Sequence, residues 1–181
     1  MLTTLQRIAC FIDDLSERTG HVIAWLTLGT VLLTFAVVVL RYGFDSGSIA
    51  MQEAVSYLHA AVFMLGAAYT LKHDGHVRVD IFYRRLSARG QAMVNLLGTL
   101  LLLLPVCIYI MASSLEYVAI SWGLREGSQQ AGGLNAVFLL KTAIPVMAVL
   151  LVLQGIAIAL HSLLKLLGAE QPAGAEVDGE L

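Results

Sequence analysis

Long uncharged apolar runs alternate with short polar segments along this chain. Four runs carry no Asp, Glu, Lys or Arg: residues 19–40, 54–71, 90–115 and 142–164. A helix needs about 20 apolar residues to cross a hydrocarbon core of about 30 Å, and an uncharged run of 18 or more is a candidate. The pattern therefore predicts four transmembrane helices, at about 22–40, 54–71, 92–112 and 142–164.

Two shorter amphipathic pieces flank these runs. Residues 1–18 place apolar side chains at helical spacing, with charged residues on the other faces, which is typical of a helix lying in the membrane interface. Residues 80–86 show the same pattern over a shorter stretch. The last segment, 166–181, is rich in Ala, Gly, Pro and acidic residues, and we expect it to be disordered. The membrane domain is then 19–165.

Composition excludes a soluble fold. Hydrophobic residues make up 58% of the chain, charged residues only 13%, and the mean hydropathy is +0.79. A typical soluble domain is about 25% charged. The net charge of −2 offers no basic field for nucleic acid. The predicted fold class is an all-α integral membrane protein with four transmembrane helices, an interfacial amphipathic N-terminal helix and a short amphipathic cytoplasmic helix.

The prolines and cysteines have structural interpretations. Pro105 lies inside the third run and Pro145 near the start of the fourth, and each predicts a kink. Neighbouring helices or waters satisfy the carbonyls that proline frees in a membrane bundle. Cys10 and Cys107 lack metal-type spacing, and small packed thiols are preferred over a disulfide or redox pair.

The basic residues predict an orientation. Eight of the 11 Lys and Arg residues lie in the N-terminal arm, the segment between the second and third runs, or just after the fourth. The positive-inside rule then places both termini and the middle loop in the cytoplasm. The segments 41–53 and 116–141 would face outward.

Catalytic, metal and cofactor sites are not indicated. A transporter usually buries ionisable residues at mid-membrane, and the middles of these four runs carry none. The main alternative is a b-type haem or a quinone held between His21, His59 and His161, as in the anchor of a redox complex. Interfacial or hydrogen-bonded histidines are the preferred interpretation. His73 and His76 lie on either side of a glycine turn. Two histidines exposed to solvent at such a turn are a commoner arrangement than a metal site.

The outward segment 116–141 is the most distinctive part of the chain. Trp122, Arg125 and Glu126 lie within five residues and precede several glycines. Trp122 at a membrane boundary is typical of an aromatic anchor, which composition alone favours. An aromatic residue beside charged residues and a glycine turn is also typical of a docking surface.

Taken in order, these motifs resemble the small membrane subunit (Q-type) of tripartite ATP-independent periplasmic (TRAP) transporters. The matching pieces cover roughly residues 20–165. They are Arg41-Tyr42-Gly43-Phe44, Gln52-Glu53-Ala54, Gly66-Ala67-Ala68, Gly75-His76-Val77-Arg78-Val79-Asp80, Trp122, Glu126-Gly127-Ser128, Gly132-Gly133-Leu134, Leu140-Lys141, Ile144-Pro145 and Leu153-Gln154-Gly155.

The resemblance implies a non-catalytic subunit of a sodium-coupled uptake system for organic acids in the bacterial inner membrane. Its partners would be a large multi-span transport subunit, which it braces, and a periplasmic solute-binding protein, which it helps to dock. No cofactor is expected. The candidate docking or subunit-contact residues are Arg41, Glu53, Gly66, Ala67, Trp122, Arg125 and Glu126. The family-signature cytoplasmic loop contributes His76, Arg78 and Asp80.

Overall fold

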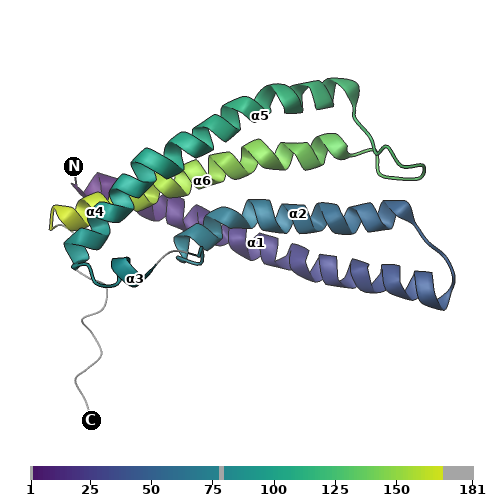
Figure 1. Ribbon diagram of the computed structural model, residues 1–181, viewed down its shortest axis with the longest axis horizontal. Helices are drawn as coiled ribbons and strands as arrows, with labels where there is room; N and C mark the ends of the chain where they lie inside the picture. The colour runs from purple at the N-terminus through teal and green to yellow at the C-terminus, as the bar shows by residue number, and fades with distance from the viewer. Residues whose placement is uncertain (1, 78–79, 169–181) are drawn as a thin grey trace, which may run out of the picture.

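Four long helical rods run side by side in the computed structural model, which describes residues 2–77 and 80–168 (Figure 1). All four are long and apolar enough to cross a membrane. The chain is therefore an all-helical protein with four candidate membrane spans over its described residues. The helices are α1 (Leu2–Gly43), α2 (Ile49–Lys72), α3 (Asp80–Tyr83), α4 (Ala88–Gly98), the π-helix η1 (Thr99–Leu103), α5 (Leu104–Leu124) and α6 (Val137–Leu166).

The first rod joins the N-terminal arm to the first span. Residues 2–18 are helical, as the pattern predicts, and α1 continues through them without a break for 42 residues. Side chains support the junction, since the Thr19 hydroxyl donates to the Leu15 carbonyl at 2.8 Å and His21 Nδ1 lies 2.8 Å from the Glu17 carbonyl. At 1.5 Å per residue α1 is about 63 Å long, so it extends well beyond a hydrocarbon core of about 30 Å.

The third rod is one continuous helix made of α4, η1 and α5, and its irregular part precedes Pro105. Proline has no N–H to donate, and its ring clashes with the carbonyl four residues before it. The chain responds with a π turn, in which the Leu104 N–H donates to the Thr99 carbonyl five residues back. The disturbance expected at Pro105 is thus a local widening of the helix. Pro145 lies inside α6, which continues past it.

Helix α6 is the centre of the bundle and packs against α1, α2, α4 and α5. Several of its buried residues are small, including Ala148, Gly155 and Ala157. A Cβ on Gly155 would come within 3.1 Å of both Leu103 and Leu104, so glycine permits the close approach of η1 to α6. Close packing on small residues is typical of membrane helices.

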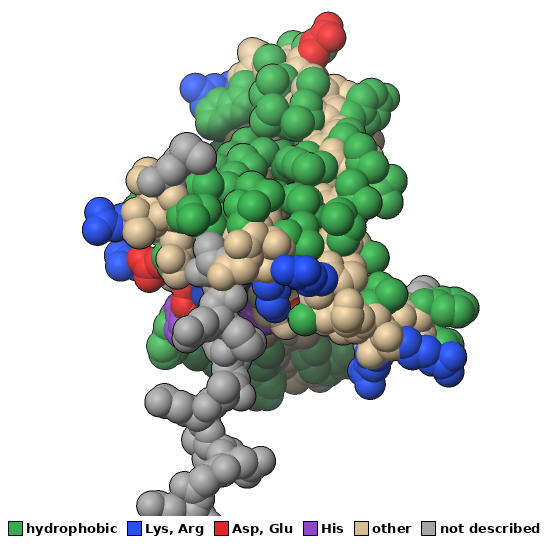
Figure 2. Space-filling view, turned by 90° about the vertical axis from the view of Figure 1, so that its left-hand side faces the viewer, with side chains coloured by type: hydrophobic (Ala, Val, Ile, Leu, Met, Phe, Trp, Pro, Cys, Tyr) green, Lys and Arg blue, Asp and Glu red, His purple; other side chains and the backbone are tan. Residues whose placement is uncertain are grey.

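The rods converge at one end and spread at the other (Figure 1). We call them the α3 end, where α1 begins and α6 ends, and the loop end, where residues 125–136 join α5 to α6. Seen from the α3 end, apolar side chains cover much of the visible rods, and Lys and Arg side chains lie around them (Figure 2). Large apolar residues also face outward elsewhere, such as Trp25 on α1 and Tyr109 on α5. A lipid bilayer or a partner helix would cover such a surface.

Candidate interaction sites

The loop after α5 is built on two residues with positive φ. Arg125 ends α5 in the left-handed region at φ 47°, and the Glu126 N–H then donates to the Ser121 carbonyl at 3.0 Å. Gly132 adopts φ 81°, and the Ser128 N–H donates to the Leu134 carbonyl at 2.9 Å. These bonds fold residues 125–136 into a compact connection, a conformation that glycine makes possible at position 132.

Glu53 fastens this loop to the second rod. Its carboxylate accepts hydrogen bonds from the Ser128 hydroxyl and from the Leu134 N–H, the latter at 2.7 Å. A carboxylate that accepts two hydrogen bonds is held firmly. Glu53 was expected to contact a partner, and in this structure its carboxylate is engaged within the chain. These bonds hold the loop beside the start of α2.

Trp122, in the last turn of α5, and Arg125, the residue that ends this helix, form an exposed stack beside the loop. The Trp122 indole N–H donates to the Thr142 hydroxyl at 2.9 Å, and its ring meets Phe138 edge-on with centroids 4.6 Å apart. The Arg125 guanidinium carbon lies 5.6 Å from the centroid of each ring, within cation–π range. Arg125 remains exposed. The loop end thus presents a cation on a fixed aromatic base.

Glu126 faces inward and closes a separate ion pair. Its carboxylate accepts hydrogen bonds from Lys141 Nζ at 2.5 Å and from the Ser121 hydroxyl at 2.6 Å. These bonds, that from Lys141 first, lower the pKa of Glu126 from its ordinary value of 4.5. Lys141 Nζ also lies 3.9 Å from the centroid of the Tyr117 ring. Of the three neighbouring candidates, Arg125 and Trp122 therefore reach the surface together, and Glu126 pairs within the chain.

A polar network joins α1 to α6 toward the α3 end. The Ser16 hydroxyl donates to Gln154 Oε1 at 2.6 Å, and Gln154 Nε2 donates to Asp13 Oδ1 at 2.9 Å. His161 Nε2 lies 2.8 Å from the other oxygen of Asp13. Gln154 is only 1% exposed, so each of its bonds is made away from water. Buried polar groups need such partners.

Glu17 makes the corresponding link from α1 to α2. Lys72 Nζ donates to its carboxylate at 2.5 Å, and His73 Nε2 lies 3.0 Å away. Close packing accompanies this link, because a Cβ on Gly20 would overlap the ring of Tyr69. Tyr69 in turn contacts His73, with ring centroids 4.4 Å apart and the ring planes tilted by 50°. Polar bonds and a tight helix crossing therefore occur together at this end.

Neither helix-to-helix link follows from the sequence pattern. The pattern places Asp13 and Glu17 among the charged residues of the N-terminal arm, and Gln154 within the family motif Leu153-Gln154-Gly155. One signal was available, since Gln154 is an amide inside an otherwise apolar run. Such a residue in a membrane helix usually faces another helix.

The remaining candidates lie apart from these clusters. Gly66 faces α1, where an added Cβ would meet Ile23 at 3.8 Å, and its neighbour Ala67 is half-buried. Arg41 is exposed in the last turn of α1. In the family-signature loop, His76 is exposed. Position 80, at the end of this loop, is where α3 begins. The Arg78 and Asp80 side chains lie outside the described part of the structure.

The three histidines of the haem alternative have different surroundings. His21 lies beside the Glu17 carbonyl, His161 beside Asp13, and His59 is exposed on α2. Among the described residues, no three His, Cys, Asp or Glu side chains gather closely enough to hold a metal ion. Cys10 is exposed and Cys107 buried, and both thiols are free.

The architecture defines a small multi-pass membrane protein whose polar groups join helices and shape one exposed loop. Residues 30–165 match the family model described as Tripartite ATP-independent periplasmic transporters, DctQ component, and the chain belongs to that family. This confirms the resemblance noted from the sequence motifs.

Two relatives agree with this assignment. A Haemophilus influenzae protein named as a TRAP transporter small permease protein is 34% identical over 79 residues, 44% of this chain and 48% of that protein. The C4-dicarboxylate TRAP transporter small permease protein DctQ of Vibrio cholerae is 28% identical over 92 residues, 51% of this chain and 38% of that protein. The matches thus span about half or less of each relative. No solved structure matches the chain.

Proposed function

We propose that this protein is the small, non-catalytic permease subunit of a sodium-coupled TRAP system that takes up organic acids across the bacterial inner membrane. The family match over residues 30–165 is the observation that carries the proposal. The name of the Vibrio cholerae relative, which specifies C4-dicarboxylates, supports a carboxylate as the solute class.

The first part of the proposed role is to brace a large multi-span transport subunit. Outward apolar residues such as Trp25 and Phe35 on α1 provide a surface that fits a second membrane protein. The small residues of α2 contribute within the bundle, since Gly66 lies against α1. Leu replacements at Gly66 and Ala67 should therefore lower recovery of the complex in detergent, and unchanged recovery would count against this role.

The second part is to help receive a periplasmic solute-binding protein at the loop end. Arg125 suits this role because it is exposed and because Trp122 and Phe138 hold its guanidinium in place. A cation on a fixed rim acts mainly on the association rate and loses influence as salt rises. Charge and geometry together support Arg125 as the docking residue.

The test is solute uptake into proteoliposomes that contain both membrane subunits, as binding protein is titrated. Uptake by Arg125→Glu should fall at low binding-protein concentration and recover at high concentration, with the defect fading as salt rises. Gln129→Glu is the control, because it adds a negative charge at another exposed position of the same loop, apart from the aromatic stack. If Arg125→Glu matches wild type at every concentration, docking lies elsewhere.

The proposed role requires the loop end to face the periplasm and both termini to face the cytoplasm. The distribution of Lys and Arg supports this orientation. Single cysteines at Ser48 and Gln129, in a variant lacking Cys10 and Cys107, should react with an impermeant reagent in intact cells. A cysteine at Ser87 should not react, and labelling there would reverse the orientation.

A further inference from the structure

Residues 81–89, which run from α3 into the first turn of α4, form a projection that we call the α3 projection. Ile81 and Phe82 expose 68% and 74% of their surface, and Leu86 in the following turn exposes 40%. Seen from the α3 end, a projecting part of the molecule carries apolar side chains next to Lys and Arg side chains (Figure 2). Exposed apolar groups gathered in this way are typical of a surface that meets a membrane or a partner.

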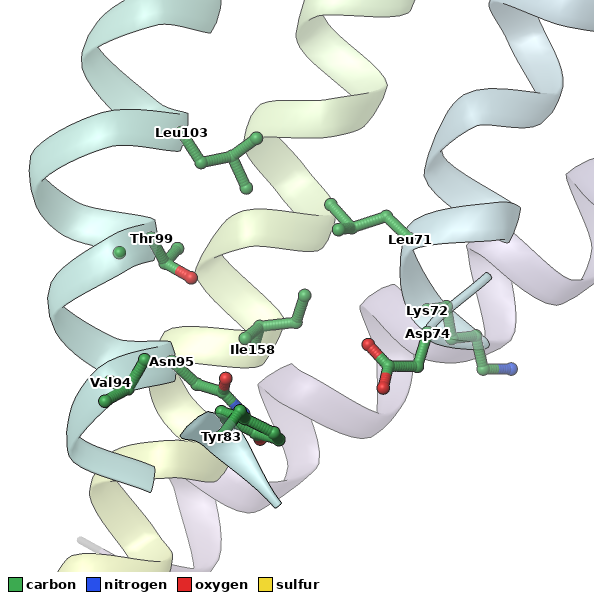
Figure 3. A pocket seen from close by; sticks show the side chains of 10 residues that line it. Leu71, Lys72, Asp74, Tyr83, Val94, Asn95, Thr99, Leu103 and Ile158 are labelled. Carbon is green, nitrogen blue, oxygen red and sulfur yellow. The ribbon is translucent and has the colours of Figure 1, made fainter. Parts of the chain in front are cut away.

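The α3 projection is fixed to the bundle through its least exposed side chain, Tyr83. The Tyr83 ring lies beside Asn95 at the edge of a cavity of about 400 Å³, and Asn95 Nδ2 donates to the tyrosine hydroxyl at 2.9 Å (Figure 3). The Gln91 side chain donates to the Tyr83 carbonyl at 3.4 Å and to the Leu86 carbonyl at 3.3 Å. These bonds hold Tyr83 inward, so the apolar residues beside it are exposed by the fold itself.

The α3 projection also carries two arginines without partners. Arg85 and Arg89 are exposed, and neither guanidinium makes an ion pair or hydrogen bond in the part of the chain that the structure describes. Arg84 already interacts within the chain and is not counted with them. A guanidinium presents several N–H donors in a fork that matches the oxygens of a phosphate group. Apolar groups and unpaired cations therefore occur together on one short segment.

The position of the α3 projection corresponds to the surface of a bilayer. Arg89 lies in the first turn of α4, and the exposed apolar residues Met93, Val94 and Leu97 follow it on the same helix. Helix α3 lies off the side of the rods rather than beyond their ends (Figure 1). A segment at this level meets the lipid headgroups, where apolar side chains enter the acyl boundary and basic ones stay at the surface.

We propose that the α3 projection binds anionic phospholipids, of the phosphatidylglycerol type, at the membrane surface. Ile81 and Phe82 enter the boundary between headgroups and acyl chains, and Arg85 and Arg89 bind the lipid phosphates. A soluble anion would leave the two apolar side chains in water. A zwitterionic lipid carries an ammonium that offsets its phosphate, so an anionic surface attracts unpaired arginines more strongly. The proposed orientation enters only in assigning these lipids to the cytoplasmic leaflet.

The test measures the depth of position 82 in nanodiscs that hold the full chain with any partner subunits that copurify. An apolar spin label is attached to Phe82→Cys in a variant lacking Cys10 and Cys107. Its collisions with oxygen, which enters lipid, are compared with its collisions with a water-soluble nickel chelate. The label should be in lipid when the discs contain phosphatidylglycerol, and in water when they contain phosphatidylcholine alone or when salt is high. A label at Gln129, exposed in the loop at the other end, should stay in water throughout.

A double substitution tests the two arginines directly. Arg85→Gln with Arg89→Gln should lower the ratio of lipid-exposed to water-exposed label about 25-fold in discs with phosphatidylglycerol, since each arginine near an anionic leaflet contributes about five-fold. Arg7→Gln with Arg18→Gln is the matched control, because it removes two exposed arginines of α1 and should leave the depth of position 82 unchanged. A label at Ile81→Cys should repeat the result obtained at position 82.

Three results would overturn the proposal. Equal depth with and without phosphatidylglycerol would show that the arginines do not select the headgroup. A label that stays in water in all discs would show that the α3 projection does not touch the membrane. A label shielded from both oxygen and the nickel chelate would show that a partner protein covers it. None of these results depends on uptake or on orientation, so the proposed transport role is tested separately.

Discussion

The two ends of this bundle use polar side chains in opposite ways. At the α3 end they join helix to helix, as Ser16 and Asp13 of α1 do with Gln154 of α6. At the loop end most of them fasten a loop, as Glu53 does through Ser128 and Leu134. The rods accordingly converge at the α3 end and separate toward the loop end (Figure 1).

This difference indicates that the two ends of the bundle have different structural roles. An apolar cavity of about 310 Å³ lies between α2 and α6 toward the loop end, lined by residues such as Tyr57, Leu139 and Val146. Both ends also contain sites of close approach, since an added Cβ would press on neighbouring side chains at Gly20 and Gly155 and equally at Gly133 in the loop. A firmly joined α3 end can hold the helices in register, while the loop end exposes Arg125, the residue that we propose for docking.

Removing Gln154 should produce the largest effect. Gln154→Leu leaves the Ser16 hydroxyl and the Asp13 carboxylate without their shared partner, and we expect a loss of about 2–4 kcal/mol in the free energy of unfolding. Unfolding by SDS in mixed micelles, followed by circular dichroism, measures it. The exposed Gln52 is the control, and Gln52→Leu should change stability little. Equal effects of the two changes would mean that the α3 end is not held by this network.

Gly20 tests the tight crossing of α1 and α2. Gly20→Ala places a methyl group against the Tyr69 ring and should cost about 1–3 kcal/mol, the usual effect of overpacking. Gly29→Ala, on the same helix with open space around it, should be neutral or slightly stabilising because alanine favours helix. The same unfolding assay applies, and partial rescue by Tyr69→Ala would identify the ring as the obstacle. A neutral Gly20→Ala would show that the crossing of α1 and α2 does not depend on close packing against the Tyr69 ring.

Glu53 tests how the loop is held. Glu53→Gln removes the negative charge and one of two acceptor oxygens, so the hydrogen bonds with the Ser128 hydroxyl and the Leu134 N–H are weakened, even though the amide can still donate to the former and accept from the latter. This weakening should speed hydrogen exchange of the Leu134 amide about five-fold. Exchange in the α3 end, read from peptides of α4, should not change. Glu116 is exposed, and Glu116→Gln serves as control. Equal hydrogen exchange of the Leu134 amide in both variants would show that Glu53 does not hold the loop.

Acid should weaken the loop end slightly through Glu126. Its pKa is lowered in the folded state, first by Lys141 and then by Ser121, so deprotonated Glu126 favours folding. This contribution is complete above the ordinary pKa of 4.5 and is lost as pH falls through the folded-state value. The stability difference between wild type and Glu126→Gln should therefore shrink between pH 6 and pH 3. A difference independent of pH would show that the pair with Lys141 does not contribute.

Sequence alone was sufficient for the four spans, because a bilayer requires long uncharged apolar runs and this chain has four of them. The sequence was less informative about where each helix begins and ends. Helix α5 continues to Leu124 and α6 begins at Val137, both outside the uncharged apolar runs that predict these two spans. Helices extend into the interface as long as capping and side-chain bonds support them. For the same reason, the sequence pattern did not predict that α1 continues without a break across residues 18–21.

The sequence also indicated that Trp122 and Arg125 lie close together, because they are three positions apart at the end of one helix. Contacts between partners far apart in the chain could not be inferred in this way. Asp13 meets Gln154 across 141 positions, and Glu53 meets Leu134 across 81. Apolar content determines which segments cross a membrane, but the rotation and axial position of each helix determine which polar side chains meet. Those depend on close packing at residues such as Gly20 and Gly155, and only the tertiary structure decides them.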